Sequence, residues 1–128
     1  MTNSSKIKTI EIESANQEVA KKHLEKYHNI EFILQDANAV IDNMDENFDL
    51  IFADTFPGKV FNREKVLGSV KVGGYYIVDD LIPQVNWPDD DHPLKVKELV
   101  KALEADNRFN ILKLNWASGL IVCVRKSN

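Results

Sequence analysis

Short apolar runs alternate with helical segments along the chain. The runs are rich in Ile, Val and Phe, and they predict strands over residues 7–12, 30–34, 48–53 and 75–78. A run that is apolar throughout, such as 50–53, is typical of a sheet covered on both faces. The alternation of strand and helix therefore predicts an α/β fold with a mostly parallel sheet.

The two helices expected in the first half begin at recognisable caps. Ser14 is followed three residues later by Gln17, which is the spacing of a capping box. The apolar face of this helix is expected to contain Ala15, Val19, Ala20, Leu24 and Tyr27. Asp36 is a good N-cap for the second helix, which follows it directly.

Two more helices are expected in the second half. One spans about residues 62–70 and is stopped by Gly73 and Gly74. Pro93 suits the first turn of the other. The apolar stripe of that last helix is Val96, Leu99, Val100 and Leu103.

The chain is expected to end in a hairpin. Strands are predicted at 109–114 and 120–124, and only residues 115–119 separate them. That segment is too short for a parallel crossover, so the two strands should be antiparallel. Because no repeat, linker or low-complexity segment divides the chain, residues 1–128 are expected to form a single domain.

Length and charge narrow the classes of function. The 128 residues carry 16 Lys and Arg against 20 Asp and Glu, a net charge of −4 that argues against a dedicated nucleic-acid binder. No apolar run approaches the roughly 20 residues of a membrane span. The polar start has no secretory signal, so the cytoplasm is the expected compartment. Cys123 is the single cysteine and is expected to be an inert core residue.

Carboxylates follow successive predicted strands, at the edge where α/β proteins bind ligands. Asp54, Asp79 and Asp80 would repel one another unless a cation lay among them. Oxygen ligands of this kind suit Mg²⁺ or Ca²⁺. This set therefore predicts a divalent metal site.

The earlier strands also end in acidic residues. Glu11 or Glu13 could accept hydrogen bonds from the two hydroxyls of an adenosine ribose. Asp36 is explained equally well as a helix cap. The glycine-rich phosphate-binding motifs G-x-G-x-x-G and G-x-x-x-x-G-K-[ST] do not occur in the sequence.

Five segments occur in a fixed order: K-T-I-E-I-E-S-A-N, F-I-L-Q-D-A, F-D-L-I-F-A-D, L-G-S-V-K-V-G-G-Y-Y-I-V-D-D and the final hairpin. Together, over about residues 8–126, they resemble class I S-adenosylmethionine-dependent methyltransferases. The branch they resemble is the catechol and caffeoyl-CoA type of O-methyltransferase. The resemblance implies a Rossmann-like sheet, S-adenosylmethionine as cofactor and a small hydroxylated acceptor.

The resemblance also implies roles for residues of the first three strand ends. Glu11 matches the residue that binds the ribose hydroxyls of the cofactor. Asp36 and Ala37 match the pair that meets the adenine, and Asp54 is expected to border the cofactor as well.

In the same way, Asp54, Asp79 and Asp80 match the three metal ligands of that branch. There a divalent cation holds both oxygens of the acceptor, lowers the pKa of a hydroxyl and aligns its oxygen for attack on the methyl group.

The sequence departs from the family at the expected general base. The family has a Lys three residues after the metal Asp, where this chain has Pro57. Lys59 could substitute if the loop over residues 55–61 is remodelled. His92 is a second candidate base, although a role at the start of a helix beside Pro93 explains it as well.

A second departure concerns the sheet. The family order is 3-2-1-4-5-7-6, and its first strand with the glycine-rich loop would lie upstream of Met1. The strands at 7–12 and 48–53 would then have open edges. Either they close on each other, or a second copy pairs with them in a homodimer, or the chain is a fragment.

Three functions compete. The first is an S-adenosylmethionine-dependent O-methyltransferase. The second is a catalytically inactive relative that keeps the fold and acts as a binding or assembly module. The third, an NAD-binding half-domain, explains Glu11 but not the set formed by Asp54, Asp79 and Asp80.

Overall fold

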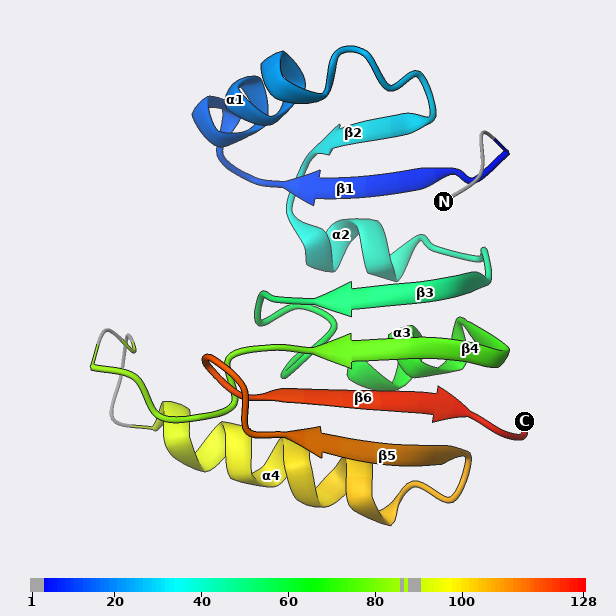
Figure 1. Cartoon of the computed structure of the whole chain (residues 1–128), viewed down its shortest axis with the longest axis vertical. Coiled ribbons are helices and arrows are strands. Elements are labelled where there is room, and N and C mark those ends of the chain that lie inside the picture. Colours follow the sequence, from blue (N-terminus) through cyan, green and yellow to red (C-terminus); the bar gives the residue numbers. More distant parts are fainter. Residues whose placement is uncertain (1–3, 86, 88–90) are drawn as a thin grey trace. The chain divides into compact units, whose positions relative to one another are not determined.

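The structure is a computed structural model that describes residues 4–85, 87 and 91–128. Its elements are, in chain order, β1 (Ile7–Glu11), α1 (Ser14–Leu24), β2 (Ile30–Leu34), α2 (Ala37–Asp42), β3 (Phe48–Ala53), α3 (Arg63–Gly68), β4 (Val70–Val78), α4 (His92–Ala105), β5 (Phe109–Leu114) and β6 (Leu120–Arg125) (Figure 1). They form two compact units, Met1–Asn43 and Met44–Asn128. No helix of the described residues has the length and apolarity needed to cross a membrane.

The first unit is a β-α-β-α segment. β1 and β2 are parallel, and Glu11 lies opposite Leu34 at the end of the pair. The predicted inward face of α1 is only partly correct, because Val19 and Tyr27 are about half exposed and Gln17 is the buried residue of the helix. A two-stranded sheet is too narrow to cover a broad helical face, which accounts for the difference.

The predicted capping box of α1 is not formed. Ser14 is the first helical residue, and the N-cap residue is Glu13, whose side chain makes no capping hydrogen bond. The cap predicted for α2 is confirmed, since the Asp36 side chain accepts a hydrogen bond from the N–H of Asn38 at 2.8 Å.

The second unit contains a four-stranded sheet in the order β3-β4-β6-β5. β3 and β4 are parallel, while β6 is antiparallel to both β4 and β5. The predicted α/β fold and the antiparallel C-terminal hairpin are therefore confirmed. Helix α4 begins at His92 and has Pro93 in its first turn, as predicted.

β4 is longer than the sequence pattern predicts. It begins at Val70 and runs through Gly73 and Gly74, which were expected to stop the preceding helix. A β-carbon on Gly74 would lie 2.8 Å from the Lys71 carbonyl oxygen and 2.9 Å from that of Asp49, and Gly73 has φ of +82°. The two glycines thus allow a bulge, where the register between β3 and β4 shifts.

One face of the four-stranded sheet forms the core of the second unit. α3 packs beside β4 and α4 beside β5 (Figure 1), and Tyr76, Leu99 and Cys123 are fully buried. Burial raises the pKa of the Cys123 thiol to about 12, as expected for an inert core cysteine. Leu50 and Phe52 alternate with inward side chains along β3 and are more than half exposed.

The two sheets agree with the family order once its central strand is left out. β2-β1 corresponds to one side of that order and β3-β4-β6-β5 to the other. Among the described strands, β1 pairs only with β2 and β3 only with β4.

Candidate functional site

The carboxyl ends of β3 and β4 place three carboxylates at one edge of the sheet. Ala53 lies opposite Val78 at the end of this parallel pair, so Asp54 and Asp79 follow at the same edge. The N–H of Asp79 donates to the Ala53 carbonyl oxygen at 3.3 Å. Asp80 comes next, in a left-handed backbone conformation with φ of +63°.

The loop after β3 brings Lys59 into this edge. The Phe56 carbonyl oxygen accepts hydrogen bonds from the N–H groups of Lys59, Val60 and Phe61, at 3.2, 2.7 and 3.0 Å. The buried Tyr76 hydroxyl donates to the Gly58 carbonyl oxygen at 2.8 Å. This compact turn fixes the backbone on either side of Lys59.

Lys59 is a buried cation within the acidic edge. Its side chain is 2% exposed, and Nζ donates to the backbone carbonyl oxygens of Asp79 and Asp80 at 2.5 and 3.4 Å. Burial lowers the pKa of Lys59, and the carboxylates of Asp80, Asp54 and Asp79 oppose that shift. The pKa of Asp54 is raised, first by burial and then by the charge of Asp79.

Two of the carboxylates already have donors from the protein. Asp79 Oδ1 accepts hydrogen bonds from the N–H of Asp80 and from the Ser118 hydroxyl, both at 2.7 Å. Asp80 Oδ2 accepts one from Trp87 Nε1 at 3.2 Å. Both side chains are therefore held by neighbouring segments of the second unit.

Sequence reasoning did not identify Ser118 as part of this site. Ser118 lies in the β5–β6 turn, and its carbonyl oxygen accepts hydrogen bonds from the N–H groups of Leu81 and Ile82 at 2.9 and 2.7 Å. Gly119 has φ of +88°, and a β-carbon there would lie 2.6 Å from Ile82 Cγ1. The Ser-Gly pair is the one signal in the sequence for this close approach.

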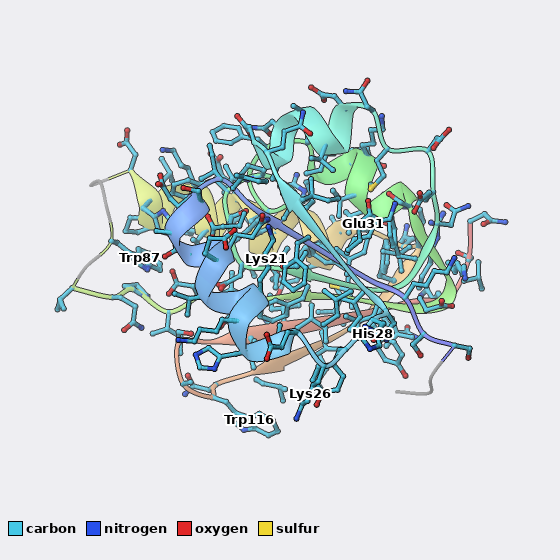
Figure 2. The ribbon with its side chains drawn as sticks, turned by 90° about the horizontal axis from the view of Figure 1, so that it is seen from above. Lys21, Lys26, His28, Glu31, Trp87 and Trp116 are labelled. Carbon is cyan, nitrogen blue, oxygen red and sulfur yellow. The ribbon has the colours of Figure 1, made fainter. Side chains whose placement is uncertain are left out.

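His92 closes the site from the start of α4. It is 3% exposed, and its ring centroid lies 4.1 Å from that of Trp87 and 5.1 Å from that of Phe56. Trp87 lies beside the first turn of α4 in Figure 2. Among the described residues, neither ring nitrogen of His92 has a hydrogen-bond partner. A buried polar group without a protein partner is costly, and it marks a place where a ligand can bind.

These side chains surround one cavity of about 260 Å³. It is lined by Asp54, Thr55, Phe56, Lys59, Asp80 and His92. The structure thus brings the two candidate bases of the sequence analysis, Lys59 and His92, to the same cavity as two of the predicted metal ligands.

The predicted metal site is not formed by the described residues. Over 4–85, 87 and 91–128, no three His, Cys, Asp or Glu side chains come close enough to hold a metal ion. The Asp79 and Asp80 side chains accept hydrogen bonds from Ser118 and Trp87, and the Lys59 ammonium donates to the backbone carbonyl oxygens of the same two residues. The donor set observed here does not fit a divalent cation.

The first unit carries the residues expected at the cofactor. Glu11 Oε1 accepts hydrogen bonds from the N–H groups of Ile12 and Glu13 at 2.8 and 2.9 Å, and Oε2 lies 3.5 Å from Asn16 Nδ2. The N–H of Glu13 makes the largest contribution to lowering the pKa of Glu11. The carboxylate is therefore ionised and fixed at the end of β1.

Asp36 and Ala37 lie at the matching end of β2. Asp36 caps α2, and Ala37 is the first residue of that helix. The capping role, which the sequence left as an equal alternative, is thus observed for Asp36. It does not by itself test the expected contact with adenine.

Solved structures share this fold over nearly the whole chain. A protein from Corynebacterium glutamicum superposes with a TM-score of 0.84 and 16% identity, covering 100% of this chain and 64% of its own. The O-methyltransferase TomG from Streptomyces achromogenes, solved in complex with S-adenosylmethionine, has a TM-score of 0.83 and 17% identity over 99% of this chain and 65% of its own. The fold is that of a Rossmann-like methyltransferase.

Sequence comparison gives the family. Caffeoyl-CoA O-methyltransferase 1 of Nicotiana tabacum is 33% identical over 143 residues, which cover 95% of this chain and 59% of that relative. The sequence profile of the O-methyltransferase family matches residues 1–126. This chain belongs to the O-methyltransferase family and spans about three fifths of the length of the curated relatives it matches.

Proposed function

We propose that this protein transfers a methyl group from S-adenosylmethionine to a hydroxyl oxygen of a small acceptor. The observation that carries the proposal is the cavity at the ends of β3 and β4, lined by Lys59 and His92. Membership of the O-methyltransferase family supplies the class of reaction.

The cofactor contacts are proposed from residues at the strand ends. Glu11 is ionised, and within the described part of the chain its Oε2 has one hydrogen-bond contact, a long one with Asn16, so it is suited to accept hydrogen bonds from ribose hydroxyls. The Asp36–Ala37 turn is proposed to meet the adenine, as the family resemblance implies. Asp54 remains a predicted cofactor contact, also because of the family resemblance.

His92 is proposed to accept the hydroxyl proton of the acceptor. S-adenosylmethionine, when bound, supplies a methyl group on a positively charged sulfur. His92 takes the proton at a ring nitrogen while the acceptor oxygen forms its bond to the methyl carbon and the bond between that carbon and sulfur breaks. Phe56 and Trp87 hold the His92 ring and offer aromatic surface to an aromatic acceptor.

A methyl-transfer assay with labelled S-adenosylmethionine tests this proposal. Catechols and caffeoyl-CoA are the first acceptors to try, because the curated relatives are named for the latter. His92→Phe keeps an aromatic ring between Phe56 and Trp87 and should lower the rate about 100-fold or more. His23→Phe on exposed α1 is the matched control. An unchanged rate in His92→Phe would contradict the assigned role, and no transfer to any acceptor would favour the inactive relative.

We also propose that the protein forms a homodimer. We propose the cytoplasm as its compartment. β1 and β3 each pair with only one of the described strands, and such edges favour pairing with another chain. Sedimentation equilibrium should give a mass of twice 14.6 kDa at micromolar concentration. A single species of 14.6 kDa would contradict the dimer.

A further inference from the structure

The ammonium of Lys59 donates to the backbone carbonyl oxygens of Asp79 and Asp80, at the strand ends where the sequence predicts a divalent metal. We propose that Lys59 takes the place of that divalent cation, so that this site positions the acceptor oxygen without a metal ion. The part of this inference that concerns the acceptor rests on the proposed function. The part that concerns the metal stands on the geometry of the second unit alone.

The first argument is the position of the ammonium. Nζ donates to the carbonyl oxygens of Asp79 and Asp80, the two residues that directly follow β4, and the side chain is 2% exposed. Asp54, at the end of the neighbouring strand, also interacts electrostatically with Lys59. A buried ammonium at this position supplies the positive charge that the three carboxylates need, and it repels a second cation.

The second argument concerns the carboxylate oxygens. Asp79 Oδ1 accepts from Ser118 and from the N–H of Asp80, and Asp80 Oδ2 accepts from Trp87. A metal ion that recruited these oxygens would have to displace donors which the fold already provides. Mg²⁺ and Ca²⁺ bind proteins through carboxylate oxygens, with water filling other positions, so the hydrogen bonds that already engage Asp79 and Asp80 weaken this site for either ion.

The third argument is that Lys59 is held in place. Its loop is fixed by the three hydrogen bonds to the Phe56 carbonyl oxygen and by the bond from the Tyr76 hydroxyl to Gly58. An ammonium has three N–H donors, and two are used by the carbonyls of Asp79 and Asp80. Among the described residues no partner takes the third, which we assign to an acceptor oxygen in the cavity that Lys59 lines together with His92. Lys59 thereby offers the charge stabilisation that a metal ion provides elsewhere.

Cation binding by the metal-stripped 128-residue chain tests the proposal without S-adenosylmethionine or an acceptor. The readouts are the melting temperature in Mg²⁺ or Ca²⁺ and the luminescence of bound Tb³⁺. Wild-type protein should show no change at about 10 mM Mg²⁺ or Ca²⁺, since an ion that does not bind the folded state cannot stabilise it. Lys59→Met removes the buried positive charge, so that the carboxylates, which the described residues hold too far apart for a metal ion, can close on a cation. The variant should bind these cations at least about tenfold more tightly, with a rise in melting temperature.

Two variants control for charge and position. Lys59→Arg keeps a cation in the site and should stay unresponsive. Lys71→Met removes an exposed Lys paired with Asp49 on the same sheet and should also stay unresponsive. If Lys59→Met does not fold, Lys59→Gln replaces it with the same expected gain.

Two results would overturn the proposal. One is cation binding by the wild type that is lost in Asp79→Asn. The other is a folded Lys59→Met or Lys59→Gln that gains no affinity for any of the three cations. Failure of the methyl-transfer assay would leave this test intact, because cation binding is measured in the absence of both substrates.

Discussion

At the scale of single residues, Asp106 shows how one ion pair couples stability to pH. Arg108 Nε and Nη2 donate to the Asp106 carboxylate at 2.9 and 2.6 Å, and Nη2 also lies 2.8 Å from Glu64 Oε1. These hydrogen bonds from Arg108 are the largest cause of a lowered pKa for Asp106. A lowered pKa means that the unfolded state binds this proton more tightly. The stabilisation is therefore present above the ordinary value of 3.8 and is lost as the pH falls through the lowered value.

Asp106→Asn should remove part of this acid sensitivity. We expect wild-type protein to lose more free energy of unfolding than the variant between neutral pH and about pH 3, by about 1 kcal/mol. Urea unfolding at both pH values measures the difference. Asp49→Asn, at an exposed pair with Lys71, is the control. Equal losses in wild type and Asp106→Asn would show that the ion pair does not contribute.

At the scale of elements, a single hydroxyl connects β4 to the loop that carries Lys59. Tyr76 is fully buried, and its hydroxyl donates to the buried Gly58 carbonyl at 2.8 Å. Tyr76→Phe keeps the ring but leaves that carbonyl without its donor, which should cost about 1–3 kcal/mol of unfolding free energy. Tyr75→Phe, at the exposed neighbouring position, should cost far less. Equal effects of the two variants in urea unfolding would mean that the hydroxyl does not anchor the loop.

Arg125 connects the last strand to the end of α3. Its Nη1 donates to the carbonyl oxygens of Leu67, Gly68 and Val70 at 3.2, 2.9 and 2.5 Å. These are carbonyls that the helix end cannot satisfy itself.

Arg125→Met keeps much of the apolar stem but removes the donors. It should lower the unfolding free energy by about 2–4 kcal/mol, because buried carbonyls lose a charged partner. Lys126→Met, at the exposed next residue, is the matched control. Thermal or urea unfolding compares the two, and a loss under about 0.5 kcal/mol for Arg125→Met, within the range of ordinary surface changes, would contradict this role.

The local pattern of apolar and polar residues predicted most of the strands and helices. The strands at 30–34, 48–53 and 109–114 have the predicted bounds, since runs of apolar residues between polar turns strongly favour strands. The pattern failed at Gly73 and Gly74, where a bulge keeps two glycines inside β4. It also failed at Ser14, where the local hydrogen bonds before α1 are instead those that the N–H groups of Ile12 and Glu13 donate to the Glu11 carboxylate.

Only part of the candidate site could be predicted, because the sequence pattern is local and the remaining contacts are long-range. Strand ends can be located from sequence, so Asp54, Asp79 and Asp80 were expected at one edge. The burial of Lys59 among them depends on contacts with residues about 20 positions away, and the bond from Ser118 to Asp79 spans 39 positions. Periodicity carries no information on such long-range contacts. The predicted metal site rested on the three carboxylates alone, because the sequence pattern does not show that Lys59 is buried beside Asp79 and Asp80.

At the scale of the whole molecule, the account depends on whether the protein binds the cofactor of its family. The sequence contains no glycine-rich phosphate-binding motif, and Glu11, Asp36 and Ala37 are the proposed contacts in the first unit. With so few contacts, the dissociation constant for the cofactor should lie nearer the millimolar than the micromolar range. This corresponds to a binding free energy of about 4 rather than 8 kcal/mol in favour of the complex.

Calorimetric titration of the full chain with S-adenosylhomocysteine is the most direct measurement of this claim. We expect weak but saturable binding that Glu11→Ala abolishes. Glu31→Ala, on exposed β2 in the same unit, should leave the binding unchanged. Micromolar binding that Glu11→Ala does not change, or no heat of binding at millimolar ligand, would contradict weak cofactor binding through Glu11.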